Sequence, residues 1–347
     1  MQMFGSDNYS PVHPNVLREL ARVNDGHVVA YGADPYTDEA VRILKSHVGN
    51  DCEIFLTFNG TGANVICLSG LLKPWQSVIC ARNAHINTDE GAAPERIAGV
   101  KLVPIDTPDG KLVPEMIEPY LSVLGDEHRA QPHVISISNV TELGTVYTVD
   151  ELSRLTAFAH RHGLVVHCDG ARIANASASL SVSIKELTEG VGLDALSFGG
   201  TKNGLMGAEA AVFFGDFSRF EGLIIRKQSA QLASKMRYLS AQFIALYRDS
   251  TWLECARHAN VMAARLAEGL KANGCEITHA QDANEVFCVM PSELYAPLNE
   301  EFHFYPWDET RNEVRLVTSW DTEPTIVDAF ITRLRNLRAE QGTAGAR

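Results

Sequence analysis

The sequence predicts an α/β protein, with a mainly parallel sheet in a large domain and a smaller α/β domain at the C-terminal end. Three observations predict it. Short apolar runs alternate with helical patterns through the middle of the chain, which is the rhythm of βαβ units. Near residue 250 this rhythm gives way to a long helical segment. The 347 residues also exceed the roughly 250–300 at which one hydrophobic core stops growing. We expect a large domain over residues 1–250, a small domain over 251–340 and a flexible tail over 341–347.

Apolar runs bounded by turn residues predict the strands of the large sheet, and amphipathic stretches between them predict its helices. In the stretch 149–162, for example, Leu152, Leu155 and Phe158 recur at helical spacing. The last run follows Gly207 closely, which favours an antiparallel neighbour. The predicted strands are Cys52–Phe58, Ser77–Cys80, Lys101–Ile105, His133–Ser138, Leu164–Cys168, Ala195–Phe198 and Ala210–Phe214.

The small domain is expected to begin with a long helix, Thr251–Asn273, and to end with another, Pro324–Glu340. Pro324 suits the first turn of the last helix, where a missing N–H group costs nothing. Between the helices, three strand-like runs predict a small sheet whose aromatic side chains form core or the edge of a lid. These runs are Glu285–Met290, Phe302–Tyr305 and Asn312–Thr318.

The composition excludes several kinds of partner. The net charge is −13 with dispersed Lys and Arg, whereas nucleic-acid binding needs a basic face. No apolar run approaches the ~20 residues of a membrane span, and the first residues lack a signal-peptide pattern. The 7 cysteines contain no C-x-x-C pair, which favours buried thiols in a reducing cytoplasm. Because no H-E-x-x-H motif occurs either, we expect no metal site.

A first candidate loop, Phe58-Asn59-Gly60-Thr61-Gly62-Ala63-Asn64, joins a predicted buried strand to a helix. Free N–H groups, small residues and a hydroxyl at a helix N-terminus can cradle a phosphate. A dinucleotide fingerprint would need a third glycine where Val65 stands, so that interpretation fails. The remaining alternative is a tight turn that uses glycine for steric reasons alone.

Two further loops also follow predicted strands, and in open α/β sheets ligands gather at the carboxyl ends of strands. Asp169 ends a hydrophobic run, where a carboxylate is costly to bury unless a cationic group, such as a protonated pyridine nitrogen, faces it. The alternative is an acid that caps the next segment. Lys202 lies in Gly199-Gly200-Thr201-Lys202-Asn203-Gly204, a tight and apolar setting that suits imine formation. The alternative is a surface lysine on a turn.

The order of these loops is the order used by fold-type-I pyridoxal-phosphate (PLP) enzymes. Over about residues 4–335 the chain resembles one family among them, the low-specificity L-threonine aldolases of the β-eliminating lyase superfamily. The resemblance is carried by Phe4-Gly5-Ser6-Asp7-Asn8-Tyr9, Tyr31-Gly32-Ala33-Asp34-Pro35, the three loops above, Ala84-His85 with Asp89-Glu90, Met236-Arg237 and Val314-Arg315-Leu316-Val317-Thr318.

The resemblance implies roles around the cofactor. Lys202 matches the lysine that forms a Schiff base with PLP, and Asp169 matches the partner of the pyridine nitrogen. His85 matches the imidazole stacked on the ring, also discussed as a base, and Asp89 is grouped with it as catalytic. The remaining cofactor contacts implied are Gly60 and Thr61 at the phosphate and Arg172 near the phenolic oxygen.

Other roles implied by the resemblance concern the substrate and a neighbouring subunit. Ser6 and Arg315 match groups that hold the substrate carboxylate, and Arg172 is a further candidate for this role. A guanidinium suits the task because it pairs with a carboxylate through two hydrogen bonds. Tyr31, expected near the substrate, joins Lys227 and Arg237 as residues that reach the site of a second subunit. The resemblance therefore implies a homodimer or homotetramer.

The activity implied is reversible cleavage of L-threonine, L-allo-threonine or a related β-hydroxy-α-amino acid to glycine and an aldehyde. Gly5 before Ser6 and Thr201 before Lys202 depart from many members and look like the branch that contains phenylserine aldolase. A phenylserine preference is therefore one alternative, and β-elimination by another PLP lyase is a second. A PLP fold that has lost catalysis is a third, disfavoured because the motif residues are all present.

Overall fold

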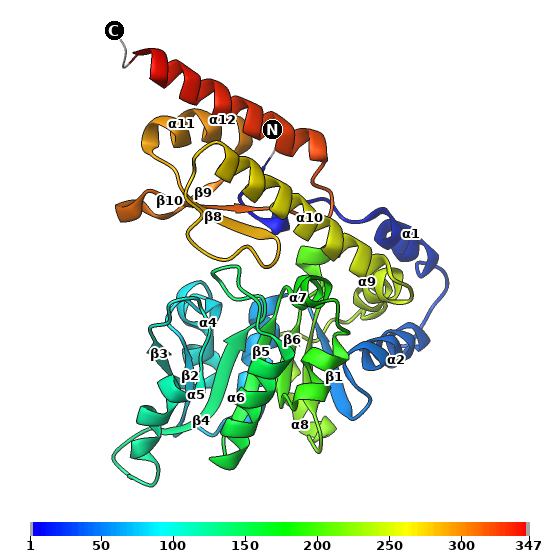
Figure 1. The fold of residues 1–347 in the computed structure, drawn as a ribbon. Helices are drawn as coiled ribbons and strands as arrows, with labels where there is room; N and C mark the ends of the chain where they lie inside the picture. Colours follow the sequence, from blue (N-terminus) through cyan, green and yellow to red (C-terminus); the bar gives the residue numbers. More distant parts are fainter. Residues whose placement is uncertain (1–2, 345–347) are drawn as a thin grey trace.

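The computed structural model describes residues 3–344. Figure 1 shows two α/β parts of unequal size, each a β-sheet with the helices packed on it, and we call them the larger and the smaller layer. The larger is built on a seven-stranded sheet of order β1-β7-β6-β5-β4-β2-β3, in which only β7 runs against its neighbours. The predicted antiparallel strand is therefore confirmed. The strands are β1 (Cys52–Thr57), β2 (Gln76–Ala81), β3 (Lys101–Ile105), β4 (Gln131–Ser138), β5 (Val165–Gly170), β6 (Ala195–Phe198) and β7 (Glu209–Phe214).

Helices cover the sheet because its strands are apolar on both faces. The capping box expected of a strong helix start occurs in α6, where Thr148 and Glu151 cap each other's backbone N–H groups. The helices of this layer are α1 (Pro14–Arg22), α2 (Pro35–Val48), α3 (Gly60–Leu71), α4 (His85–Thr88), α5 (Pro114–Ile117), α6 (Val149–Arg161), α7 (Ile173–Leu180), α8 (Arg219–Gln228) and α9 (Arg237–Tyr247).

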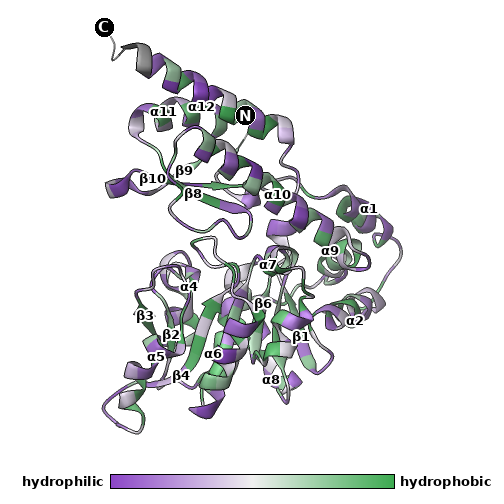
Figure 2. Ribbon diagram, viewed as in Figure 1, coloured by the Kyte–Doolittle hydropathy of each residue, from purple (hydrophilic) through white to green (hydrophobic). Residues whose placement is uncertain are grey.

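The smaller layer packs helices against a three-stranded antiparallel sheet of order β8-β10-β9. Figure 2 shows hydrophilic and hydrophobic residues alternating along α10 and α12, as expected for helices with one buried face. Its elements are α10 (Thr251–Ala272), β8 (Glu285–Val289), α11 (Ser292–Phe302), β9 (Tyr305–Asp308), β10 (Glu313–Val317) and α12 (Pro324–Ala344). The tail expected from residue 341 begins within α12, and residues 345–347 lie outside the described part.

The strand expected over Phe302–Tyr305 is wrong. Phe302 ends a helix, α11, which the sequence did not reveal because Pro297 lies inside it and proline usually breaks helices. Phe302 and Phe304 instead pack their rings against Phe330 of α12, with centroids 5.1 and 5.7 Å apart. The strand β9 begins only at Tyr305. The expectation that these phenylalanines form small-domain core is confirmed.

Two segments connect the layers. The first half of α10 buries Trp252 and Ala256 in the core of the large sheet, and its second half buries Leu266 and Leu270 in the small core. At the other end of the chain, Phe4 is buried in the core of the smaller layer, although the segment that follows it belongs to the larger layer. Within the described residues, no helix is long and apolar enough to cross a membrane.

Candidate active site

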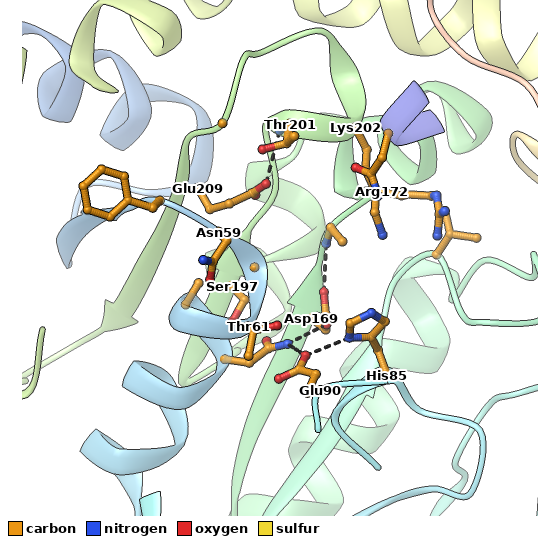
Figure 3. Close-up of a pocket in the computed structure, with 18 of the residues that line it drawn as sticks. Asn59, Thr61, His85, Glu90, Asp169, Arg172, Ser197, Thr201, Lys202 and Glu209 are labelled. Atoms are coloured by element: carbon orange, nitrogen blue, oxygen red, sulfur yellow. Dashed lines mark hydrogen bonds and ion pairs between the residues drawn. The ribbon is translucent and has the colours of Figure 1, made fainter. Parts of the chain in front are cut away.

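A cavity of about 400 Å³ opens where the parallel strands of the large sheet end. Its walls come from the segments that follow β1, β2, β4, β5 and β6, so residues far apart in sequence meet at one edge of the sheet. Figure 3 shows Thr61, His85, Asp169 and Lys202 around this space. The structure thus brings together the three loops singled out in the sequence.

The first loop forms the N-terminal turn of α3. Asn59 caps the helix by accepting a hydrogen bond from the N–H of Gly62 (2.8 Å), while the N–H groups of Gly60 and Thr61 have no intrahelical acceptor. Gly60 has open space where a side chain would stand, whereas a Cβ on Gly62 would lie 2.3 Å from the Gln231 side chain. The loop therefore presents free donors to the cavity, and its second glycine leaves room for the Gln231 side chain.

Asp169 stands near the end of β5 and is buried. Its carboxylate accepts hydrogen bonds from the side-chain amide of Asn64 (2.8 Å) and from the N–H of Ala171 (3.0 Å). Burial favours the neutral acid, but the Asn64 hydrogen bond and the charges of Lys202 and His85 outweigh it and lower the pKa of Asp169. The carboxylate therefore stays ionised in an enclosed place, where it can face a cation.

His85 begins α4 and is oriented by Glu90, which was not among the predicted site residues. The Nδ1 atom of His85 lies 2.8 Å from Oε1 of Glu90, which also accepts the Asn64 amide at 2.6 Å. The hydrogen bond to Glu90 is the main reason that the pKa of His85 is raised. Asp89, expected in the site, is exposed and bonded to Thr88, so within this chain the neighbouring acid lies in the cavity instead.

Lys202 lies in the short 3-10 turn Thr201–Asn203 after β6. Glu209 on β7 holds this turn by accepting hydrogen bonds from the N–H groups of Gly200 (2.9 Å) and Thr201 (3.2 Å). A Cβ on Gly199 would lie 2.4 Å from the carbonyl oxygen of Ala171, so only glycine lets the two loops approach so closely. Lys202 itself forms no hydrogen bond or ion pair with any described residue, which leaves its amine available.

Arg172 belongs to a buried chain of alternating charges. Asp7 accepts two of its hydrogen bonds, at 2.7 and 3.1 Å, and Glu285 of β8 lies 3.4 Å from its third nitrogen. Glu285 also lies 3.7 Å from Arg315 of β10, whose guanidinium stacks over Trp307. Burial disfavours the charge of Arg172, but Asp7 and Glu285 raise the pKa of Arg172 beyond its usual range, so this arginine stays charged. This network of charges joins the N-terminal segment, the large layer and the small layer. Neither of its acids was predicted as a site residue from the sequence.

The remaining predicted residues lie outside the cavity of this single chain. The Ser6 hydroxyl accepts a hydrogen bond from the N–H of Asn8. Arg315 donates to the carbonyl oxygen of Gly5, the residue before Ser6, at 3.5 Å. Tyr31 is 56% exposed and Lys227 is exposed. Arg237 donates to the carbonyl oxygen of Gly26 at 3.1 Å. None of these residues lines the cavity of this chain. Tyr31, Lys227 and Arg237 were expected to reach the site of a second subunit, whereas Ser6 and Arg315 were expected to hold the substrate.

His85, Glu90 and Asp169 bring atoms of the kind that bind metal ions within 4.8 Å of one another. The amide of Asn64, however, already donates to both carboxylates and occupies their shared side. We assign no metal to this group.

Comparison with known proteins identifies the family. The model of the β-eliminating lyase family matches residues 4–293. The chain belongs to this family. Among its relatives is a low specificity L-threonine aldolase of Pseudomonas sp., 40% identical over 338 residues, which are 96% of this chain and 97% of the relative. The structure of this β-eliminating lyase family member also superposes on solved structures. One is a Leishmania major threonine aldolase (TM-score 0.92, 33% identity, 97% and 99% of the two chains), and another is SPT with its PLP internal aldimine (TM-score 0.74, 15% identity, 98% and 88%), which shows the shared fold alone.

Proposed function

We propose that this lyase is a PLP-dependent aldolase that cleaves L-threonine, L-allo-threonine or a related β-hydroxy-α-amino acid to glycine and an aldehyde. The observation that carries the proposal is that Lys202, with an unengaged amine, shares one cavity with an ionised, buried Asp169 and an open helix N-terminus. The relatives named low specificity L-threonine aldolase support the choice of reaction.

The residues present fit PLP. The free N–H groups of Gly60 and Thr61 suit its phosphate, and the Asp169 carboxylate suits a protonated ring nitrogen. When bound, PLP supplies an aldehyde that links covalently to amines and a ring that draws electrons from Cα. Lys202 is the amine we assign to the linkage, and His85, fixed by Glu90, is the side chain we assign to the ring face.

Substrate orientation is assigned to Arg315, with Ser6 beside it. The guanidinium of Arg315 is partly exposed, and its Nε atom has no hydrogen-bond partner among the described residues. Arg172, by contrast, already gives two hydrogen bonds to Asp7, so it is less free to take a carboxylate. A carboxylate held by Arg315 would fix which bond of Cα is aligned for cleavage.

The active assembly we propose is a homodimer, or a dimer of such dimers, in which Tyr31, Lys227 and Arg237 act on the partner's cavity. None of the three lines the cavity of its own chain, which supports this, as does the exposure of apolar side chains close to them in sequence, such as Val29 and Phe220. We place the enzyme in the cytoplasm, because all seven cysteines are buried free thiols, as is typical of a reducing compartment.

The test is to incubate the purified, PLP-loaded protein with L-threonine, L-allo-threonine and L-phenylserine in parallel. We expect equal amounts of glycine and aldehyde from at least one of them, and the ratio of rates reports any phenylserine preference. Pyruvate and ammonia in place of glycine would identify β-elimination instead. Turnover should vanish in Lys202→Ala and persist in the control Lys101→Ala, a change on the exposed edge strand. An inactive wild type would contradict the proposal.

A further inference from the structure

One carboxylate that faces the cavity has no assigned task. Glu142 lines the cavity, is half-buried, and forms no hydrogen bond or ion pair with any described residue. The other carboxylates of the cavity wall are engaged. Asp169 and Glu209 each accept two hydrogen bonds, and Glu90 holds His85 and Asn64.

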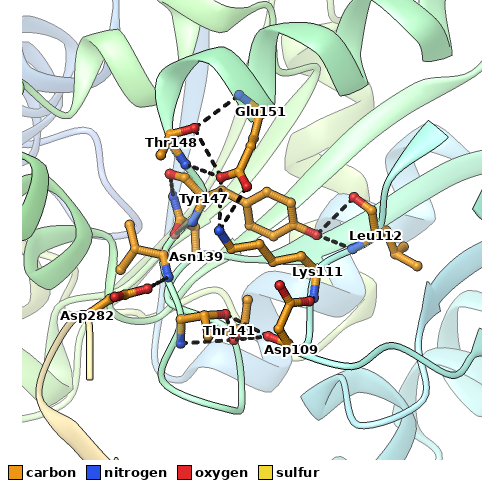
Figure 4. Close-up of polar contacts among 11 residues, drawn as sticks. Asp109, Lys111, Leu112, Asn139, Thr141, Tyr147, Thr148, Glu151 and Asp282 are labelled. Atoms are coloured by element: carbon orange, nitrogen blue, oxygen red, sulfur yellow. Dashed lines mark hydrogen bonds and ion pairs between the residues drawn. The ribbon is translucent and has the colours of Figure 1, made fainter. Parts of the chain in front are cut away.

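The turn between Thr141 and Thr145, which carries Glu142, is fixed from several sides, and Figure 4 shows the contacts of Thr141 and Asp282. Thr141 and Thr145 close a tight turn through an N–H to carbonyl bond of 2.9 Å and a hydroxyl contact of 2.7 Å. The Thr145 hydroxyl also donates to the carbonyl oxygen of Asp109 (2.7 Å), and Asp282 accepts the N–H of Val146 (3.1 Å). A turn held this firmly keeps its one acidic side chain, that of Glu142, in the cavity at little entropic cost.

The charges around Glu142 come from every side of the cavity. Burial is the largest influence and raises the pKa of Glu142 above its ordinary value, against the opposing effects of Lys202 and Arg172. Asp169 and Glu285 raise it further. A carboxylate with a raised pKa is a stronger base than an ordinary one, and is therefore better suited to take a proton near neutral pH.

The other candidate base is less well placed for the task. The hydrogen bond to Glu90 raises the pKa of His85, and the charge of Glu142 adds to this effect. A higher pKa keeps more of the imidazole protonated, and an imidazolium cannot accept a proton. Asp89 lies outside the cavity.

We infer that Glu142 is a catalytic residue that accepts the β-hydroxyl proton of the substrate, an inference that rests on the proposed aldolase function. The O–H bond breaks as its proton passes to the Glu142 carboxylate, and the electron pair left on oxygen forms the aldehyde C=O bond. The Cα–Cβ bond breaks, and its electron pair stays with Cα until a proton from solvent replaces the lost carbon and completes glycine. Glu142 then releases its proton to solvent with the departing aldehyde.

The experiment compares wild type, Glu142→Gln, Glu142→Asp and the control Glu127→Gln, an exposed acid that does not line the cavity. For each PLP-loaded protein, glycine release from L-threonine is measured across pH, and exchange of the glycine α-hydrogen is followed by NMR in D₂O. Glycine has no β-hydroxyl, so its exchange does not need the proposed base. We expect Glu142→Gln to slow cleavage by about 100-fold or more and to lose the acidic limb of the pH profile, with exchange within about threefold of wild type. Glu142→Asp, which keeps the carboxylate, should recover part of the rate.

A second measurement needs no cofactor. The pKa of Glu142 is raised in the folded protein. In the PLP-free proteins, the wild type should therefore lose stability relative to Glu142→Gln as the pH rises above the pKa that Glu142 has in the unfolded chain. Unfolding free energies that differ by the same amount at every pH would overturn the inference. So would cleavage within threefold of wild type in Glu142→Gln, or an equal loss of cleavage and exchange, since that would indicate a purely structural role. A wild type that exchanges glycine but cleaves no β-hydroxy-amino acid would reject the aldolase function as well, and is distinguishable from these outcomes.

Discussion

Individual carboxyl groups in this cavity differ in charge because their hydrogen-bond donors differ. Asp169 accepts hydrogen bonds from the Asn64 side chain and the Ala171 N–H. These bonds, together with the charges of Lys202 and His85, keep the pKa of Asp169 low despite burial. Glu209 also accepts two N–H groups, but burial dominates and raises its pKa to about 7. Asp169 therefore stays ionised at neutral pH, where it can balance a cation, whereas Glu209 is partly protonated at the same pH while it accepts the N–H groups of the turn that carries Lys202.

At Asp169, replacement by Asn keeps the size of the side chain and removes its charge. We expect Asp169→Asn to retain PLP through Lys202 and the α3 turn, but to lose turnover by about 100-fold or more because a neutral amide cannot keep the ring nitrogen protonated. Cofactor content by absorbance and kcat from glycine release measure the two effects separately. The control is Asp216→Asn, an exposed acid. Normal kcat with cofactor bound would show that another group performs this role.

At Arg315, the proposed role is to bind the substrate carboxylate. Arg315→Ala should raise KM by about 10- to 150-fold, because a hydrogen bond to a charged group contributes roughly 1.5–3 kcal/mol. Arg315→Lys keeps the charge but loses the guanidinium fork, so a smaller rise is expected. Arg311→Ala, on an exposed turn of the same layer, is the control. An unchanged KM in Arg315→Ala would move the carboxylate site elsewhere.

Among the elements, the β6–β7 pair depends on Glu209 to hold the turn that carries Lys202. Its pKa is raised from 4.5 to about 7 in the folded protein, so folding favours the protonated acid. The stabilising contribution is therefore complete below about pH 4.5 and is lost as pH rises through 7, by roughly 3 kcal/mol in total. Glu209→Gln should abolish this part of the pH dependence in the PLP-free protein, as measured by urea unfolding between pH 5 and 8. A pH slope equal to that of wild type would contradict it.

The elements themselves were largely predictable, and the failures have physical causes. Apolar runs bounded by turn residues located all seven strands of the large sheet to within a few residues. The helix α11 was missed because Pro297 disguises it. In the site, loop chemistry pointed to Lys202 and Asp169, but sequence cannot tell which of two adjacent acids, Asp89 or Glu90, turns inward. The chain of Asp7, Arg172 and Glu285 was also hidden, because nothing local records that residues so distant in sequence meet.

For the whole molecule, the decisive prediction concerns assembly. In the proposed dimer, Lys202 comes from one chain and Arg237 from its partner, so Lys202→Ala and Arg237→Ala should each be nearly inactive. Unfolding and refolding them together should give heterodimers with one intact site. Random pairing makes half of the dimers mixed, and one good site of two then restores up to about a quarter of wild-type activity.

The control for this mixture is each variant refolded alone, which should stay inactive. Mixing without unfolding should recover activity only as fast as the subunits exchange. If tagged heterodimers are isolated and remain as inactive as their parents, the sites are not shared between chains.

The first residues of the chain contact both the large layer and the small layer, which is made from the C-terminal end. Phe4 packs against Phe330, and Asp7 holds Arg172 together with Asn284. During synthesis on the ribosome these residues emerge first, yet their binding places do not exist until almost the whole chain has followed. The large sheet can form early, but Phe4 has no ring to pack against until Phe330 of the last helix is made. Nascent chains and C-terminal truncations that stop before α12 should therefore leave the N-terminal segment without this anchor, even where the large sheet and its cavity have folded.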